Sequence, residues 1–157
     1  MPNVHWERLN TLQLGRYAEY FAKMEFASYG CDVYTSEVDD HGVDFVIKDA
    51  AKRFYEIQVN AIRGSGYVFM QKSKFDVFNP SLYLTLLLFH DNALPEIYLI
   101  PATAWNTPND LFVDRDYDKP GQTSKPEYGL NLSKKNQIHL EPYRFQSIIP
   151  SFSVNPS

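Results

Sequence analysis

The sequence predicts an α/β protein in which a mixed β-sheet is flanked by helices, and three observations support this prediction. A helical pattern near the start is followed by a series of strand patterns, and a second helical pattern comes after them. One strand pattern, over residues 82–89, is apolar enough to be a central strand covered on both faces. The length of 157 residues suits one domain that can bury its own core.

The first helix is expected over residues 10–29. Asn10 or Thr11 can cap its start, and Gly30 suits the left-handed conformation just past its end. Glu19 interrupts a row of small and apolar residues that follows helical spacing along this segment. Glu19 is therefore a candidate functional residue, although a carboxylate there also suits a solvated helix face.

Strand patterns occupy the middle of the chain. Apolar residues alternate with others over residues 43–48, and residues 53–62 carry a row of polar side chains on one face. The expected strands are residues 31–35, 43–48, 53–62, 67–70, 82–89 and 96–100.

The last third of the chain is expected to be less regular. Residues 106–127 are rich in Pro, Asp, Asn and Lys and are expected to form a long surface loop. Short helices are expected over residues 102–105 and 134–143, with Ser133 as the cap of the second. We predict a single domain over residues 1–149 and a loose tail over residues 150–157.

Composition excludes some classes of protein. The net charge of −4 and the pI of about 5.5 argue against a general polyanion-binding coat, while a local basic face remains compatible with them. Cys31 is the only cysteine, so no internal disulfide can form. No apolar run is long enough to span a membrane. From these features we expect a cytoplasmic protein without a membrane partner.

Several polar residues stand where apolar ones would be expected. Asp44 lies within a strand pattern, and Glu56, Gln58 and Asn60 share one face of the next strand. Together with Glu19, they offer carboxylate and amide oxygens of the kind that hold Mg²⁺ or Mn²⁺. Such a cation can activate water and stabilise charge on a phosphoryl oxygen. The residues are therefore adequate for metal-assisted hydrolysis of a phosphodiester.

The order of these residues resembles the PD-(D/E)XK nuclease superfamily. The matching segments are Gly15–Glu19 in the first helix, Asp40-His41-Gly42-Val43-Asp44 at the second strand, and Tyr55–Asn60 in the third. Their spacing is similar to the archaeal Holliday-junction resolvase and Mrr-like branches. The downstream segments at residues 67–69, 82–84 and 98–101 are similar to relatives of intron-encoded homing endonucleases and to a small bacterial domain family. The resemblance implies a restriction-endonuclease-like core that acts on double-stranded or branched DNA as a homodimer or a higher symmetric oligomer.

The resemblance also implies a role for each residue. Asp44 would be the principal metal ligand, Gln58 would occupy the second acidic position, and Glu19 would support the metal or its water. Asn60 falls where the family carries a lysine that orients or activates the attacking water. An amide has no charge and is a poor base, so that role cannot pass to Asn60 unchanged. A contact to transition-state charge is worth about a hundred- to a thousandfold in rate.

Three explanations for Asn60 remain open. The protein is a natural inactive member, or the charge comes from Arg63, Lys72 or Lys74, or residue 60 carries a substitution that disarms a nuclease. The same three cations are the candidates for contacts with DNA phosphates. The predicted function is therefore a metal-dependent DNA endonuclease. The alternative is a catalytically inactive nuclease fold that serves as a binding or protein-interaction module.

Two alternatives concern the local geometry. Glu56 could take the acidic position and Gln58 the lysine position, although this suits the flanking apolar pattern less well. A four-residue turn between the two strands would place Asp44 opposite Ile57, whereas a five-residue loop or a bulge would place it on the face of Gln58. The prediction depends on Glu19, Asp44 and Gln58 meeting around one cation.

Overall fold

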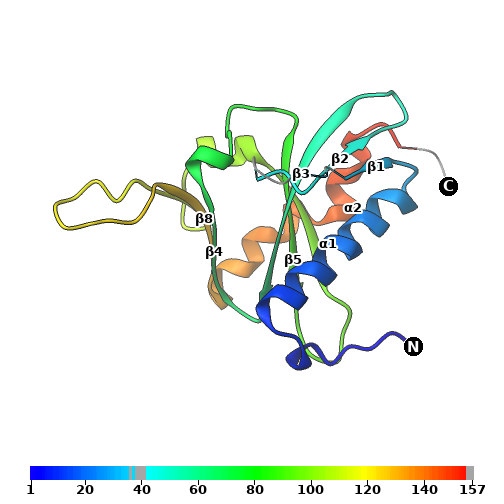
Figure 1. Ribbon diagram of the computed structural model, residues 1–157, viewed down its shortest axis with the longest axis horizontal. Helices are drawn as coiled ribbons and strands as arrows, with labels where there is room; N and C mark the ends of the chain where they lie inside the picture. The colour runs from blue at the N-terminus through cyan, green and yellow to red at the C-terminus, as the bar shows by residue number, and fades with distance from the viewer. Residues whose placement is uncertain (36, 38–41, 155–157) are drawn as a thin grey trace.

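A computed structural model describes residues 1–35, 37 and 42–154, and it confirms an α/β fold with a mixed central sheet flanked by helices (Figure 1). The helices are α1 (Thr11–Ser28) and α2 (Phe145–Ile148), with 3₁₀ turns η1 (Trp6–Arg8), η2 (Lys72–Lys74), η3 (Ala102–Asn106), η4 (Lys134–Tyr143) and η5 (Ile149–Ser151). The strands are β1 (Asp32–Tyr34), β2 (Phe45–Lys48), β3 (Phe54–Arg63), β4 (Gly66–Gln71), β5 (Leu82–Phe89), β6 (Glu96–Pro101), β7 (Phe112–Arg115) and β8 (Glu127–Leu132).

The strands of these ranges form two sheets. The larger has the order β1-β2-β3-β5-β6, and the smaller has the order β4-β8-β7. Only the pairing of β3 with β5 is parallel, so the larger sheet is mixed. Strand β5 is buried on both faces, because its alternate residues pack into two different cores. One core lies under α1, and the other lies between the larger sheet and the smaller one.

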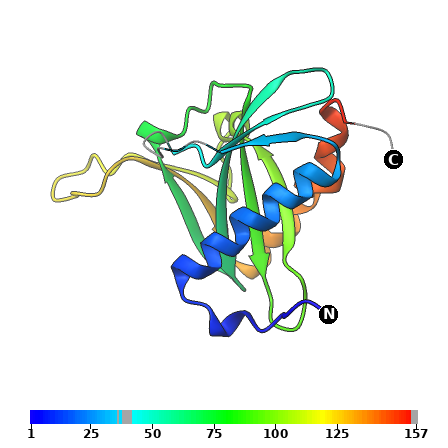
Figure 2. The same cartoon turned by 45° about the vertical axis from the view of Figure 1, so that its right-hand side comes forward.

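Helix α1 crosses one face of the larger sheet (Figure 2). Its start is fixed by a capping box, in which Asn10 accepts from the Gln13 N–H and the Gln13 side chain accepts from the Asn10 N–H. Ala18 and Ala22 are fully buried, which lets the helix lie close to the strands. Gly30 has a φ of 88°, as expected for the residue that ends a helix in the left-handed conformation.

The β2–β3 hairpin has a five-residue loop, because Lys48 pairs with Phe54. Asp49 fixes that loop: its buried carboxylate accepts from the N–H groups of Ala51 and Arg53 at 3.0 and 2.9 Å. The loop is therefore the five-residue alternative and not the four-residue turn. The strand pairing ends at Phe45 opposite Ile57, and Asp44 lies just before the first paired residue of β2.

The stretch expected to be a surface loop contains strand structure. Strand β7 lies within residues 106–127, and β8 begins at its end. Both pair in the smaller sheet, whose third strand, β4, lies far upstream, so no local pattern revealed the pairing. Residues 116–126 connect β7 and β8 as an arm that projects from the body of the protein (Figure 1).

The end of the chain also differs from the expectation. The expected helix over 134–143 is a run of 3₁₀ turns that contains Pro142, and the Ser133 side chain makes no capping bond. The tail, expected to be loose, is docked as far as the structure describes it: Phe152 is buried, and the Ser153 N–H donates to Asp49 at 3.1 Å. The Ser153 carbonyl also accepts from the Ala50 N–H at 2.7 Å. The buried Phe152 ring and these two backbone bonds of Ser153 hold the segment against the protein. None of the described helices is long and apolar enough to cross a membrane.

Candidate functional site

The candidate site lies where β2 meets β3. The N–H of Asp44 donates to the Ile57 carbonyl at 2.9 Å, and Oδ2 of Asp44 accepts from the Val59 N–H at 2.6 Å. Asp44 therefore bonds to the residues on both sides of Gln58. Because Phe45 also pairs with Ile57, two residues of one strand meet one residue of the other, as in a β-bulge. Asp44 thus contacts the backbone of β3 at Ile57 and Val59, the neighbours of Gln58.

Gln58 presents a buried oxygen. Its Oε1 has no hydrogen-bond partner among the described residues, although the atom is shielded from solvent. A buried acceptor left in this state costs about 1–3 kcal/mol, so such atoms usually have a ligand or water to bond to. Amide and carboxylate oxygens both suit a hard divalent cation, and Mg²⁺ needs only one or two protein carboxylates because it keeps several waters. The donor set of Asp44 and Gln58 therefore fits the expected metal.

Asn60 stands two residues further along β3. Its Nδ2 donates to the Phe69 carbonyl of β4 at 3.5 Å, and its Oδ1 accepts from the Ala61 N–H at 3.1 Å. Both ends of the amide are thus engaged with backbone groups. The position at which the resemblance implies a lysine carries a neutral side chain that links β3 to β4.

Glu19 approaches from α1. It forms an ion pair with Lys23 at 3.7 Å, and the two side chains are only 21% and 19% exposed. The Lys23 Nζ lies 5.6 Å from the ring centroid of Phe45, the residue after Asp44. Glu19 is therefore held near the start of β2 through Lys23, whereas Asp44 contacts the Gln58–Asn60 element directly.

Lys23 is the cation that the sequence analysis missed. It is half-buried beside the start of β2, at the end of the sheet where the motif lysine is absent. The signal was present in the sequence, because Glu19 and Lys23 have the (i, i+4) order that favours an ion pair on a helix.

The three cations proposed for DNA contacts have different surroundings. The Arg63 guanidinium donates to the carbonyls of Trp6, at 2.7 Å, and Leu9, and so ties the N-terminal segment to β3. Lys72 bonds to Asp114 and Asp116, and its ammonium lies 4.7 Å from the Tyr128 ring centroid. Against the effect of burial, the bonds to both aspartates raise the pKa of Lys72 to about 12. Within the part of the chain that the structure describes, Lys74 is the one of the three without such a partner.

A pocket of about 210 Å³ lies beside Lys74, and Glu56 lines it together with Val43 and Asp76. Glu56 accepts from the Asn79 amide at 3.0 Å, so its carboxylate is committed to the pocket wall. A Cβ on Gly42, whose φ is 80°, would lie 2.9 Å from the Lys74 Cβ and carbonyl oxygen. The backbone before Asp44 therefore runs directly against Lys74. The alternative in which Glu56 takes the acidic position would use this pocket.

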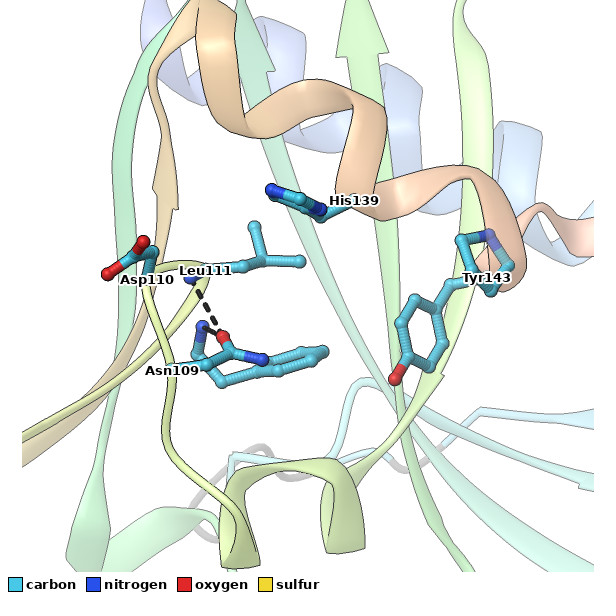
Figure 3. Close-up of a pocket in the computed structure, with 7 residues that line it drawn as sticks. Asn109, Asp110, Leu111, His139 and Tyr143 are labelled. Atoms are coloured by element: carbon cyan, nitrogen blue, oxygen red, sulfur yellow. Dashed lines mark hydrogen bonds between the residues drawn. The ribbon is translucent and has the colours of Figure 1, made fainter.

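A larger pocket, of about 350 Å³, lies against η4 and the loop before β7 (Figure 3). Asn109, Asp110, Leu111, His139 and Tyr143 are among the residues that line it, and the Asn109 Oδ1 accepts from the Leu111 N–H at 2.8 Å. None of its lining residues comes from β2 or β3. It is therefore separate from the residues discussed above.

Part of the matching segment at Asp44 is outside the described residues. Asp40 and His41 belong to that segment, and nothing further is stated of them. Over residues 1–35, 37 and 42–154, no group of three or more His, Cys, Asp or Glu side chains is arranged to hold a metal ion. A cation between Asp44 and Gln58 would therefore take one carboxylate and one amide from the described residues, with water completing its shell.

Comparisons with known proteins find similarity among solved structures. No protein-family model matches the sequence. No curated protein matches it. Among solved structures, the chain is similar to the 1.6 Å structure of Hjc, a Holliday junction resolvase from the archaeal hyperthermophile Archaeoglobus fulgidus. The two are 10% identical, the match covers 74% of this chain and 83% of the resolvase chain, and the TM-score is 0.44.

Proposed function

We propose that the protein is a DNA-acting nuclease of the PD-(D/E)XK type that hydrolyses phosphodiesters with Mg²⁺ or Mn²⁺. One observation carries the proposal: Asp44 bonds to the residues on both sides of Gln58, whose buried Oε1 has no partner in the described ranges. The Asp44 carboxylate is therefore fixed to the backbone beside Gln58, and the Gln58 side chain supplies an acceptor without a partner in these ranges. A buried acceptor in that state commonly bonds to a ligand or to an ordered water.

Each of the candidate residues would have a separate role in hydrolysis. A cation held by Asp44 and Gln58 would supply an activated water and stabilise charge on the phosphoryl oxygens. Asp44 and Gln58 would fix its position relative to β3, and Glu19 on α1 would accept a hydrogen bond from water. In the reaction, the water oxygen would bond to phosphorus and lose a proton to solvent, one P–O ester bond would break, and the released oxygen would take up a proton from solvent to become a hydroxyl. Lys23, beside the ring of Phe45, and Lys74, in the pocket that Val43 also lines, are cations that could offset phosphate charge.

A second function is favoured by Asn60. Because both ends of its amide bond to backbone groups, the position offers neither a charge nor a base to the reaction. A neutral, fully bonded side chain at this position is what we would expect of a nuclease fold that binds DNA without cutting it. The two candidates differ in the effect of restoring a lysine, which makes Asn60→Lys the deciding variant.

The experiment measures cleavage of supercoiled plasmid, linear duplex and four-way-junction DNA across a titration of Mg²⁺ and of Mn²⁺. If the protein is active, Asp44→Asn abolishes cleavage while keeping an oxygen that can accept the Val59 N–H, so loss of folding is not the cause. If it is disarmed, Asn60→Lys gains cleavage of about a hundred- to a thousandfold. Absence of cleavage by both the native chain and Asn60→Lys, with metal shown by calorimetry not to bind, would refute the nuclease proposal.

The proposal extends to a symmetric dimer in the cytoplasm. Cutting two antiparallel strands is simplest with two sites related by a two-fold axis. Sedimentation equilibrium with and without DNA measures the oligomeric state. A monomer under both conditions would contradict this part of the proposal and leave the chemistry of the single site unaffected.

A further inference from the structure

Strand β3 presents the proposed metal-binding oxygen to the side of the larger sheet that faces the smaller sheet. Gln58 and Glu56 alternate with Ile57, so both point away from the core under α1 in which Ile57 is buried. Their partners on the parallel neighbour β5 are Leu84 and Leu82, which belong to the core between the two sheets. A side chain that assists a cation at Gln58 should therefore lie on this side of the larger sheet.

The pocket of about 210 Å³ beside Lys74 lies on this same side, because Glu56 lines it. Val43, the residue before Asp44, lines it as well. The backbone at Gly42 packs against Lys74 so closely that a Cβ there would lie 2.9 Å from the Lys74 Cβ. Gly42 precedes Asp44 by two residues, which is at most about 7.6 Å between their Cα atoms. The flexible four-carbon stem of Lys74 therefore starts beside the backbone that carries Asp44.

Lys74 is exposed, and over the described ranges its ammonium forms no hydrogen bond or ion pair. The other cations considered above are committed elsewhere. The Arg63 guanidinium bonds to two carbonyls of the N-terminal segment, and Lys72 bonds to two aspartates. Lys23 already forms an ion pair on α1 and lies against the ring of Phe45, which is buried in the core on the opposite side of the sheet. Of these four cations, Lys74 is the one whose ammonium is free, among the described residues, on the side of the pocket.

The charges of the pocket make Lys74 useful only together with a metal ion. Glu56 and Asp76 line the pocket, and each carboxylate accepts a hydrogen bond from a neighbouring amide or N–H group. These two negative charges repel a phosphate, so Lys74 alone does not make the pocket an anion site. During hydrolysis, however, negative charge on the phosphoryl oxygens is stabilised by any cation that is already placed beside them.

We propose that Lys74 supplies the positive charge that Asn60 lacks, by donating an N–H to a non-bridging oxygen of the scissile phosphate. The Asn60 amide donates to the Phe69 carbonyl of β4, and β4 leads directly into η2, which carries Lys74. The ammonium keeps its proton throughout, so no bond of the lysine forms or breaks. The inference rests on the proposed function and deepens it, because among the explanations left open for Asn60 it selects a charge supplied from elsewhere. It therefore requires the native chain to cut DNA.

The test measures cleavage of supercoiled plasmid by the full chain with Mg²⁺ under single-turnover conditions. The native chain is expected to cut, and Lys74→Gln should lower the rate constant by about a hundred- to a thousandfold. Lys74→Arg keeps a cation and should lose less. Adding Asn60→Lys to Lys74→Gln should restore cleavage, because β3 then supplies the charge. Lys135→Gln is the matched control, because it removes an exposed lysine of η4 that does not line the pocket.

A second readout does not depend on cleavage. Binding of a labelled DNA duplex is measured by fluorescence anisotropy over a range of salt concentrations, with Ca²⁺ in place of Mg²⁺. Lys74→Gln should reduce the slope of log affinity against log salt concentration by about 0.9, the value for one lost phosphate contact on duplex DNA, and Lys135→Gln should not. Calorimetry and thermal melting should give native metal affinity and native stability for Lys74→Gln, since its side chain has no partner in the described ranges.

Other outcomes overturn the inference. It is wrong if the native chain does not cut, if Lys74→Gln cuts as fast as the native chain, or if Lys135→Gln loses as much activity. It is also wrong if Asn60→Lys does not restore the double variant, or if Lys74→Gln loses metal affinity or stability, because the defect would then be structural. Failure of the proposed function is separate. Cleavage by Asn60→Lys but not by the native chain would reject the role of Lys74 and keep the nuclease site, whereas absence of metal binding by the native chain would reject the site itself.

Discussion

Replacing Gln58 with methionine separates the stability of the fold from the proposed metal site. Methionine has nearly the same length as glutamine but no hydrogen-bonding oxygen. Because Oε1 of Gln58 is buried without a partner in the described part of the chain, it costs the folded state about 1–3 kcal/mol. Without metal, Gln58→Met is therefore expected to raise the free energy of unfolding by about 1–2 kcal/mol. For a chain of this length the melting temperature would rise by roughly 2–8 °C.

Added metal should make the native chain more stable than Gln58→Met. A ligand at about 100 times its Kd stabilises a folded protein by about 2.7 kcal/mol. The native chain is expected to gain this stabilisation with Mg²⁺ or Mn²⁺, whereas Gln58→Met should gain much less because one ligand is absent. Gln58→Glu, which adds a carboxylate at the same position, should bind metal more tightly than the native chain does.

Urea unfolding followed by circular dichroism, with EDTA or with increasing Mg²⁺, measures these free energies. Sodium at matched ionic strength controls for general salt effects. The reasoning fails if Gln58→Met is less stable than the native chain in EDTA, because the buried oxygen would then have an unseen favourable contact. It also fails if both proteins respond equally to Mg²⁺, since Gln58 would then not be a ligand.

Three further predictions concern stability. Arg63→Ala should lower the free energy of unfolding by about 1–3 kcal/mol in urea, since its guanidinium holds two carbonyls of the N-terminal segment; a loss of DNA affinity without that destabilisation would instead indicate a phosphate contact. Asp49→Asn should lower the free energy of unfolding by about 1–3 kcal/mol at neutral pH. Burial opposes the charge of Asp49, but backbone N–H groups and the Arg53 guanidinium hold its pKa below the usual value. The stabilisation from the charged form is therefore present above about pH 4 and is lost as the pH falls through the folded-state pKa. Between pH 7 and 2 the free energies of unfolding of the two proteins should converge, and a difference that stays constant would contradict the assignment. Asn10→Ala should cost about 1 kcal/mol in thermal melts by removing the α1 cap, and no change would show that the cap is not needed.

Local signals in the sequence predicted the elements whose causes are local. The capping residue Asn10 and the terminal Gly30 placed α1 within about a residue of its bounds, and the continuous apolar run gave the bounds of β5. Strands β7 and β8 were not predicted, because β8 contains Gly129 and the buried Glu127, and a polar or glycine residue there weakens the strand pattern. Their stability comes from pairing with β4, which no local window contains.

The candidate site was predicted in part for a similar reason. The identities of Asp44 and Gln58 could be selected from the sequence, but their closeness depended on the length of the β2–β3 loop. Asp49 decides that length by bonding to two N–H groups within the loop, and aspartate at the first loop position is a readable turn signal. The partners of Arg63 and Lys72 could not be read, because they come from segments distant in the chain.

The contact between Asp44 and β3 serves both folding and the proposed chemistry. The pairing of β2 with β3 ends at Phe45 and Ile57, so the Val59 N–H lies beyond the last strand pair. The Asp44 carboxylate accepts that N–H and takes the place of the missing strand neighbour. The bond that replaces the lost ladder contact is therefore the same bond that positions the charge beside Gln58. For this reason loss of activity in Asp44→Ala would not distinguish misfolding from loss of a ligand, whereas Asp44→Asn removes the charge and retains an acceptor for Val59.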